Sequence, residues 1–200
     1  MKNIKIIRHV QSLANAGFAT KDVKSVWLTD LGREQSYILA NNWTDNLENI
    51  IHSKYDRTLF TAGPLIDKFS QAKVFQSDLI HEFTFLDPKI FENTNPEQRK
   101  PHRENFWKQW AEFQQWKNSE NFVDFVSRAS DFANYLKLSD MDNVAIFSHE
   151  QFITMLTYIL ESWSKLKLLS EIKKDMYDLF YVQKRWLDNA EIVDLWIYFW

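Results

Sequence analysis

The amino-acid sequence predicts an α/β protein with three layers, in which helices cover both faces of a mostly parallel central sheet and a small helical cap is inserted. Apolar runs of strand length alternate with longer segments whose apolar residues recur at helical spacing, and this alternation is typical of repeated strand–helix units. Two of the runs, residues 4–7 and 144–147, end just before His9 and His149. Because ligands bind at the carboxyl ends of strands in open sheets of this class, the two histidines indicate one site.

Residues 3–7 form the first predicted strand and residues 29–43 the first predicted helix. Thr29 is suited to cap this helix, because its hydroxyl can accept a hydrogen bond from a free backbone N–H of the first turn. Gly32 falls in that turn. We expect one buried stripe along the helix, formed by Leu31, Ile38 and Leu39.

The next predicted elements are a short strand at residues 49–52, a helix at residues 57–69 and a weak strand at residues 74–75. Gly63 and Pro64 lie inside that helix. Since proline lacks a backbone donor, we expect them to bend or restart the helix axis.

Residues 85–118 differ in character from their surroundings, and we interpret them as a cap inserted into the fold. Three prolines are followed by aromatic residues at spacings of three and four. This spacing predicts one buried helix face, formed by Phe106, Trp107, Trp110, Phe113 and Trp116.

The second half of the chain returns to alternating helices and strands. The predicted helices cover residues 121–138, 150–163 and 165–177, and the predicted strands cover residues 144–147 and 190–199. The aromatic end, residues 196–200, could belong to a buried last strand or to a dimer contact.

Length and composition limit the class of protein. A chain of 200 residues fits a single domain, residues 1–200, and its net charge of −3 argues against a general nucleic-acid or membrane binder. The absence of cysteine excludes disulfides, thiolate catalysis and zinc–thiolate sites. No window approaches about 18 uninterrupted apolar residues. We therefore expect a soluble, cytoplasmic protein that is a monomer or a homodimer.

The residues at the predicted strand ends suit phosphate chemistry. An arginine presents a planar fork of donors that matches phosphate oxygens, and a neutral imidazole nitrogen can attack phosphorus. Arg8 and His9 provide both groups side by side. A single histidine after a strand is also often structural, so the rest of the pattern has to distinguish the two roles.

The spaced motifs indicate a known family. The chain resembles the histidine phosphatase superfamily, the phosphoglycerate mutase-like group, whose opening motif Arg-His-Gly-x-Ser/Thr-x-x-Asn is matched by Arg8, His9, Ser12 and Asn15. The later family motifs are matched, in the family's order, at residues 28–32, 56–62, 81–83, 148–149 and 189–192. The matches bracket nearly the whole chain.

The resemblance implies a two-step phosphoryl transfer that needs neither a metal nor a cofactor. His9 would attack phosphorus and form a phosphohistidine, which water then hydrolyses. Arg8, Arg57 and His149 would surround the phosphoryl oxygens and stabilise the developing charge. Glu82 would protonate the leaving alcohol and later deprotonate the attacking water.

Further candidates for phosphate binding lie close to these residues in the sequence. Asn15 and Ser12 could donate hydrogen bonds to phosphate or to the loop itself, and for Ser12 the structural role fits at least as well. The backbone N–H near Gln151, at a predicted helix start, could also face the anion. For the transfer, His9 must be neutral with its second nitrogen held by an acceptor, whereas His149 is more useful protonated.

Two residues depart from the family motifs, because Val10 and Glu150 stand where the family has glycine. If the glycine provides unusual backbone dihedrals, Val10 would misplace His9; if it mainly leaves space, a valine that points into the core is compatible with function. A carboxylate at Glu150 would repel phosphate unless it points outward, forms an ion pair or caps the following helix. We expect an active enzyme, because both arginines, both histidines and the candidate acid are present.

The leading functional hypothesis is a phosphatase of the histidine acid type that hydrolyses phosphomonoesters of a small phosphorylated metabolite. Two alternatives remain open: a phosphoglycerate mutase, which the short insertion disfavours, and a phosphate- or phosphoprotein-binding module that has lost turnover. Arg103 and Trp107 are candidates for substrate selectivity. A basic patch of the cap could meet an acidic substrate or form a solvated face; it consists of Arg99, Lys100, His102 and Arg103.

Overall fold

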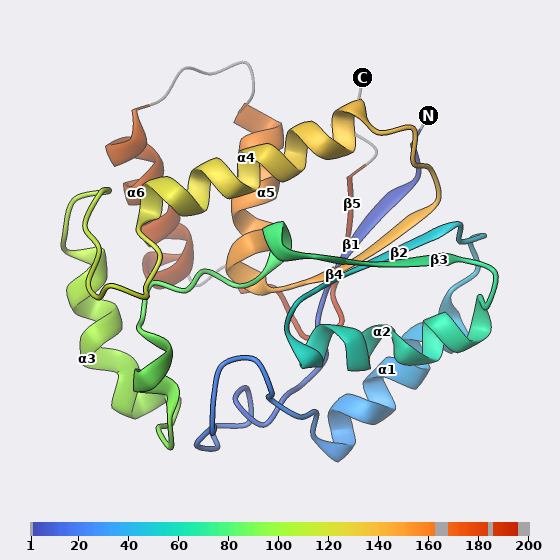
Figure 1. Ribbon diagram of the computed structural model, residues 1–200, viewed down its shortest axis with the longest axis horizontal. Helices are drawn as coiled ribbons and strands as arrows, with labels where there is room; N and C mark the ends of the chain where they lie inside the picture. Colours follow the sequence, from blue (N-terminus) through green and yellow to red (C-terminus); the bar gives the residue numbers. More distant parts are fainter. Residues whose placement is uncertain (1, 163–167, 184–185, 196–200) are drawn as a thin grey trace.

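The computed structural model of the chain describes residues 2–162, 168–183 and 186–195 (Figure 1). Its strands are β1 Ile4–Arg8, β2 Asn49–Ser53, β3 Lys73–Ser77, β4 Val144–Ser148 and β5 Ile192–Asp194. They form one sheet in the order β3-β2-β4-β1-β5. β1 to β4 all run parallel to one another, and β5 runs antiparallel to β1. The predicted mostly parallel sheet is therefore confirmed.

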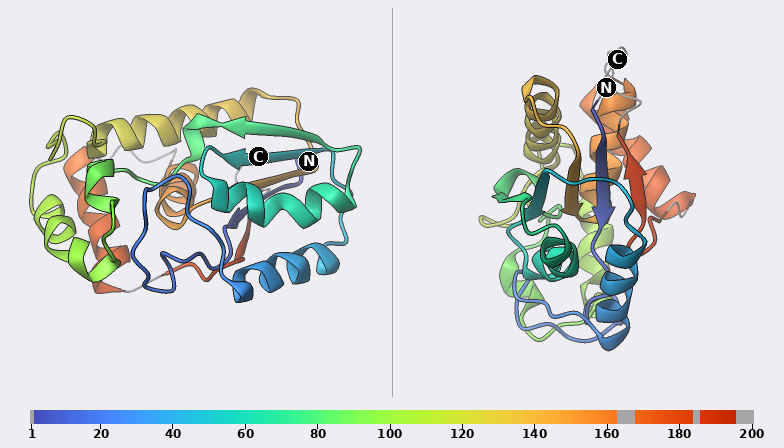
Figure 2. Two further views of the ribbon diagram at one scale, coloured as in Figure 1. Left: turned by 60° about the horizontal axis from the view of Figure 1, so that its bottom comes forward. Right: turned by 90° about the vertical axis from the view of Figure 1, so that its right-hand side faces the viewer.

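Helices cover both faces of this sheet (Figures 1 and 2). One face carries α1 (Asp30–Asn42) and α2 (Asp56–Lys68). The other face carries α4 (Phe122–Leu138) and α5 (Glu150–Ser162), and α6 (Leu169–Tyr177) contributes to the same core. This arrangement confirms the α/β fold with helices on both sides of the sheet.

The sheet divides the core into two parts, because neighbouring residues of a strand point to opposite faces. Ile6 and Ile146 pack into the core with α4 and α5, whereas Ile7 and Phe147 pack into the core with α1 and α2. All four side chains are fully buried. Burial on both faces explains why the central strands are apolar along their whole length.

α1 begins as predicted, but its buried face differs from the prediction. The Thr29 hydroxyl accepts a hydrogen bond from the Gly32 N–H at 2.9 Å, which confirms the N-cap. Leu39 is buried as predicted, but Leu31 and Ile38 are 50% and 51% exposed, so the three residues do not form one buried stripe. Gly32 lies so close to the carbonyl of Gln11 that any side chain would collide with it. This approach turns another face inward, formed by Gly32, Ser36, Leu39 and Ala40.

α2 continues through Gly63 and Pro64, so the predicted restart of its axis does not occur. The inner side of the helix is buried, and Ala62 and Leu65 pack into the core beneath the sheet. This packing outweighs the single backbone hydrogen bond that proline removes.

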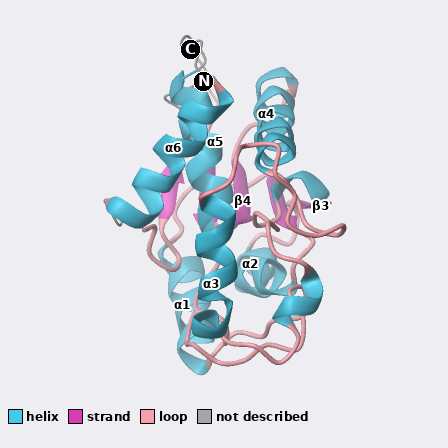
Figure 3. Cartoon of the chain, turned by 90° about the vertical axis from the view of Figure 1, so that its left-hand side faces the viewer, coloured by secondary structure: helices cyan, strands magenta, loops and turns pink. Residues whose placement is uncertain are grey.

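The segment between β3 and α4 contains two short 3₁₀ helices, η1 (Asp78–Ile80) and η2 (Pro88–Phe91), and one longer helix, α3 (Pro96–Trp107). α3 lies beyond the end of the sheet, beside the loop that follows β1 (Figures 1 and 3). We keep the name cap segment for residues 85–118.

The predicted aromatic helix face is wrong beyond Trp107, where α3 ends. Trp110 follows in a loop and is 66% exposed. The end of the helix is fixed by Lys173 of α6, whose Nζ donates to the carbonyl of Phe106 at 3.3 Å and to those of Gln109 and Trp110 at 2.9 Å. A buried cation thus binds the carbonyl groups of the last helical turn and of the loop that follows it.

Thr20, in the loop after β1, joins this loop to the cap segment. Its N–H donates to the carbonyl of Thr94 at 3.2 Å, and its own carbonyl accepts from the Asn93 N–H at 2.8 Å. Its hydroxyl accepts a hydrogen bond from Nη1 of Arg99 at 3.3 Å. We call this set of contacts the Thr20 seam.

Some predicted elements reach beyond the described residues. Trp163, the predicted end of α5, and the predicted helix start at residues 165–167 lie outside them, as do residues 196–200 of the predicted last strand. Within the described ranges, β5 is three residues long. None of the helices described there is long and apolar enough to cross a membrane.

Candidate functional site

His9 and His149 meet at the carboxyl edge of the sheet. β1 and β4 pair so that Arg8 lies opposite Ser148, and each histidine is the residue that follows. The two ring centroids are 5.2 Å apart, and both side chains are buried. The register of one parallel strand pair therefore brings together two residues from distant parts of the chain, as expected from the sequence.

The Arg57 guanidinium connects the two rings. Its Nε donates to Nε2 of His9 at 3.2 Å, and its Nη2 donates to Nδ1 of His149 at 3.1 Å. Nη1 donates to the carbonyl of Val23 at 2.9 Å, and the guanidinium carbon lies 4.7 Å from the centre of the Tyr55 ring. Arg57 is thus held rigidly between both histidines, with a planar fork of donors at the site.

The hydrogen bonds of His9 define where its proton lies. Nδ1 is 2.7 Å from the carbonyl of Val10, which can only accept, so Nδ1 carries the proton. Nε2 then keeps its lone pair, since it accepts from Arg57. Burial, followed by the charges of Arg57 and Arg8, lowers the pKa of His9. The ring is therefore neutral, with an unprotonated Nε2 and with Nδ1 held by a backbone acceptor.

His149 is held in the opposite tautomer by a chain of hydroxyl groups. Nδ1 accepts from Arg57, so Nε2 carries the proton and donates to Oγ of Ser53 at 2.7 Å. The Ser53 hydroxyl is 3.0 Å from Oγ1 of Thr58, whose own proton goes to the carbonyl of Tyr55 at 2.7 Å. Ser53 was not among the predicted site residues. Its position as the last residue of β2, next to the arginine motif, was the available signal.

Burial and the neighbouring charge of Arg57 lower the pKa of His149. The ring is therefore neutral here, which differs from the expected protonated form. The main reason is the complete burial of the ring, which disfavours its charged form, and the neighbouring cation Arg57 adds to this effect.

Glu82, two residues after η1, is half-buried in the wall of the cavity at the same site. Burial raises the pKa of its carboxyl, and this effect exceeds the opposing effects of nearby backbone N–H groups and arginines. The Phe83 N–H donates to its Oε1 at 3.0 Å. The Gln151 N–H, expected to face a bound anion, also favours the charged form of this carboxyl. A carboxyl group with a raised pKa is suited to donate and accept a proton.

Glu150, the first residue of α5, forms an ion pair with Arg8. Its Oε2 is 3.1 Å from Nη2 of Arg8, and both side chains are largely buried. Arg8 also donates to the carbonyl of Leu187. Among the described residues, Oε1 of Glu150 and Nε of Arg8 have no hydrogen-bond partner. Burial raises the pKa of Glu150 to about 7, although Arg8 acts in the opposite direction.

Val10 is accommodated without backbone strain. The positive φ angles of the described residues occur at Gly17, Asn93, Asn143 and Ala190, and Val10 is not among them. Its side chain is fully buried, and its N–H donates to Oγ1 of Thr61 at 3.2 Å. Of the two alternatives for this position, the structure agrees with a valine that points into the core.

Ser12 and Asn15 bond to each other within the loop. The Ser12 hydroxyl donates to Oδ1 of Asn15 at 2.9 Å, and the Ser12 N–H donates to the same atom at 3.1 Å. Nδ2 of Asn189 donates to the carbonyl of His9 at 2.9 Å. These bonds hold the backbone at His9 and in the loop that follows it, and they agree with the structural alternative for Ser12.

The site opens into a cavity of about 250 Å³. Of the residues predicted for the site, those that line this cavity are Arg8, His9, Ser12, Asn15, Arg57, Glu82, Gln151 and Arg103. His149 is fully buried and contacts Arg57 instead of lining the cavity. Trp107, predicted as a selectivity residue, also lies away from the cavity: it packs into the aromatic core, edge-on to Phe122, with ring centroids 5.9 Å apart.

The aromatic and basic residues of the cap segment thus lie in three different places: in the core, in the cavity wall and in contact with solvent. Arg99 and Arg103 line the cavity, whereas Lys100 is exposed. His102 lies against the Trp116 ring, with a centroid distance of 5.4 Å. The predicted basic patch is therefore not one surface.

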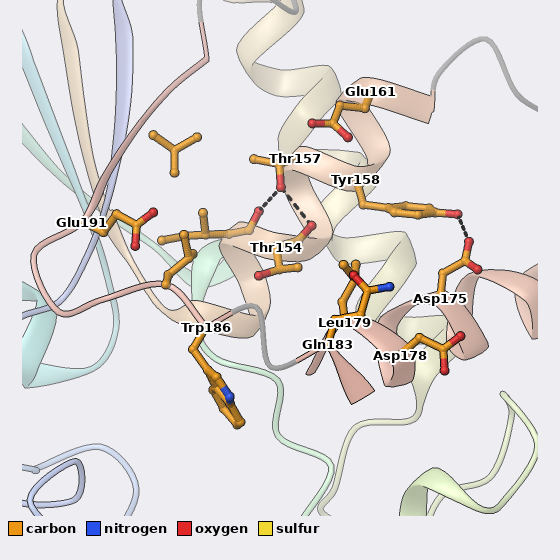
Figure 4. A pocket seen from close by; sticks show the side chains of 13 residues that line it. Thr154, Thr157, Tyr158, Glu161, Asp175, Asp178, Leu179, Gln183, Trp186 and Glu191 are labelled. Carbon is orange, nitrogen blue, oxygen red and sulfur yellow. Dashed lines mark hydrogen bonds between the residues drawn. The ribbon is translucent and has the colours of Figure 1, made fainter. Parts of the chain in front are cut away.

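A larger hollow of about 540 Å³ lies between α5, α6 and the segment that leads to β5 (Figure 4). Its described lining includes the acidic residues Glu161, Asp175, Asp178 and Glu191, and it has no lysine or arginine. Such a wall repels a phosphate, so the smaller cavity with the histidines is the better candidate for phosphate chemistry. Within the described part of the chain, no group of three or more His, Asp or Glu side chains is arranged to hold a metal ion.

Comparison with known proteins agrees with this geometry. The sequence profile of the histidine phosphatase superfamily (branch 1) matches residues 4–172. A search of curated protein sequences found no match.

Solved structures with the same fold share few identical residues with this chain. A candidate α-ribazole-5′-P phosphatase from Escherichia coli superposes with a TM-score of 0.72 at 19% identity, covering 99% of this chain and 92% of the other. A mycobacterial glucosyl-3-phosphoglycerate phosphatase superposes with a TM-score of 0.68 at 19% identity, covering 96% and 89%. The profile match over residues 4–172 shows that the chain belongs to the histidine phosphatase superfamily, branch 1.

Proposed function

We propose that this protein is a metal-independent phosphomonoester hydrolase of the histidine acid type that works through a phosphohistidine on a small phosphorylated metabolite. One observation carries this proposal: Arg57 donates to both histidines, while His9 presents an unprotonated Nε2 in the same cavity. A neutral nucleophile next to a fixed cation is what attack on a phosphate ester requires.

In the first step, Nε2 of His9 forms a bond to phosphorus, and the bond from phosphorus to the ester oxygen breaks. Arg8 and Arg57 stabilise the phosphoryl oxygens, and protonated Glu82 gives its proton to the departing alcohol. In the second step, Glu82 takes a proton from water, and the hydroxide attacks phosphorus. The bond to Nε2 breaks, and inorganic phosphate leaves.

In this mechanism His149 does not contact the phosphoryl group but positions Arg57. With Ser53 on its other nitrogen, its ring orientation is fixed from both sides. The ring therefore holds the Arg57 guanidinium in the plane that faces the phosphoryl group.

The direct test is hydrolysis of p-nitrophenyl phosphate in the presence of a chelator, between about pH 4 and pH 8. Rapid acid-free quenching followed by mass spectrometry should detect one phosphate on His9. Hydrolysis that needs added metal, or a phosphate on any other residue, would contradict the proposal.

Glu82→Gln should separate acid catalysis from the rest of the mechanism. We expect the rate of the first step, measured as release of the alcohol in a single turnover, to fall by about 10² to 10⁴ for an alkyl phosphate, whose leaving alcohol needs a proton. For p-nitrophenyl phosphate the loss should be much smaller, because nitrophenolate leaves unprotonated. The exposed Glu97 provides the control variant Glu97→Gln. The second step, in which Glu82 is the base, should slow for both substrates alike. Equal losses in the rate of the first step with both substrates would rule out Glu82 as the acid.

Glu150→Gln should change the pH dependence of anion binding. The groups that act on Glu150 are Arg8 from β1, Glu82 after η1 and Glu191 before β5. Since the pKa of Glu150 is raised to about 7, its carboxylate is charged above this pH and competes with phosphate for Arg8. Below this pH it is neutral and the competition ends.

We therefore expect the variant to bind inorganic phosphate about fivefold more tightly than the wild type near pH 8, and equally near pH 5.5. Isothermal titration calorimetry of both proteins measures this, and the ionisation of phosphate itself cancels in the comparison. Parallel pH profiles for the two proteins would contradict the competition.

The Arg8–Glu150 ion pair also supports one alternative, a phosphate-binding module without turnover. In that case inorganic phosphate binds in the calorimetric experiment, while neither p-nitrophenyl phosphate nor a panel of natural phosphate esters is hydrolysed.

A further inference from the structure

Two arginines of α3 face the same cavity as His9. Arg99 and Arg103 are four residues apart in the helix, and both line the cavity wall. Like charges at this spacing lie on one helix face and destabilise the helix. An arrangement that costs stability indicates a functional reason for it.

Neither guanidinium has a carboxylate partner within the described ranges. The other arginines that are not in contact with the histidines are paired there: Arg8 with Glu150, Arg33 with Asp30 and Arg128 with Glu120. Buried or partly buried charges in proteins are normally paired. Arg99 and Arg103 therefore differ from these arginines, each of which is paired with a carboxylate.

Arg99 is held in place by uncharged groups. Only 6% of the residue is exposed. Its Nη1 donates to Oγ1 of Thr20 at 3.3 Å and to the carbonyl of Thr94 at 3.1 Å. Its guanidinium carbon lies 4.5 Å from the centre of the Phe91 ring. The cation is thus fixed in position while its charge is not neutralised.

Arg103 supplies the second cation, one helical turn further along. Its Nε is buried without a hydrogen-bond partner among the described residues. Lys100, on the same helix, is exposed to water and needs no such partner. Two arginines on one cavity wall, neither paired with a carboxylate among the described residues, can bind one external anion between them.

From these contacts we infer that Arg99 and Arg103 form a second anion subsite, so that the substrate is a phosphomonoester with a second anionic group, a carboxylate or another phosphate. The wall of the cavity also includes Phe85, Leu86 and Phe91, which suit an uncharged connecting segment. That the group bound at His9 is a phosphate ester rests on the proposed function. The inference adds that the alcohol released from this ester carries an anionic group of its own.

Binding to the His9→Ala variant tests the subsite without turnover. Two ligand pairs differ mainly in the second anion: 6-phosphogluconate against glucose 6-phosphate for a carboxylate, and fructose 1,6-bisphosphate against fructose 6-phosphate for a phosphate. We expect the doubly anionic member of at least one pair to bind at least about tenfold more tightly. The pair with the larger ratio identifies the kind of anion.

Variants at position 103 then assign the preference to this helix. Arg103→Gln should reduce the affinity ratio to within about twofold, Arg103→Lys should retain part of it, and Lys100→Gln, the matched control, should retain all of it. Thermal melting of each variant checks that it is folded. Equal affinities within both pairs, or a preference that survives Arg103→Gln, would overturn the inference.

This experiment distinguishes the subsite from the proposed function. If the preference is present in binding but the wild type hydrolyses no phosphate ester, the subsite stands and the hydrolase proposal fails. If p-nitrophenyl phosphate is hydrolysed but the preference is absent, the hydrolase proposal stands and the subsite fails.

Discussion

His9→Ala is expected to lower kcat for p-nitrophenyl phosphate by about four orders of magnitude. The substitution removes the nitrogen whose lone pair faces Arg57 in the cavity, and no phosphohistidine can form without it. Mass spectrometry of the quenched variant should show no bound phosphate. Steady-state assays at the pH optimum of the wild type measure the loss.

His102→Ala is the matched control for this substitution. His102 belongs to α3 and packs against Trp116, away from the cavity lining. We expect its activity to stay within about twofold of the wild type, since surface substitutions have small effects. Residual turnover of His9→Ala above about one per cent of the wild type would show that His9 is not the nucleophile.

Gly32→Ala is expected to destabilise the protein by about 3 kcal/mol. A Cβ at this position would overlap the carbonyl oxygen of Gln11 and come within 3.0 Å of its carbonyl carbon. Both are backbone atoms, so they cannot turn away as a flexible side chain could. Denaturant unfolding of the purified variant measures the change in the free energy of unfolding.

Gly63→Ala provides a close comparison, because a Cβ there meets nothing within 4 Å. Alanine favours the helix over glycine, so this variant should be more stable by about 0.5–1 kcal/mol. If both variants changed stability equally, the contact between Gly32 and Gln11 would not be the cause. Because Gln11 lies two residues after His9, we also expect Gly32→Ala to reduce kcat.

The strand ends and the two histidines could be predicted from the sequence because they depend on local patterns. Apolar runs mark buried parallel strands, and residues that follow such strands meet at one edge of the sheet. Thr29 was predicted as a cap for the same reason, since capping involves a group only three residues away.

Contacts between distant segments could not be predicted in this way. The spacing of aromatic residues favoured a helix through Trp116, but Lys173 of α6 ends that helix at Trp107. The pairing of Glu150 with Arg8 depends on the register of β1 and β4 and on the start of α5. The inward face of α1 is set by its approach to Gln11, not by its apolar residues.

The Thr20 seam has a consequence for protein engineering. Exchanging residues 85–118 for another cap segment is one way to attempt a change of substrate preference. Here the cap segment is hydrogen-bonded to the loop that carries His9, through Thr20, Asn93 and Thr94. Arg99 bonds to Thr20 and also lines the cavity. A transplanted cap that lacks the matching partners would release this loop, so selectivity and rate would change together. The cap and residues 9–20 therefore have to be exchanged as one unit.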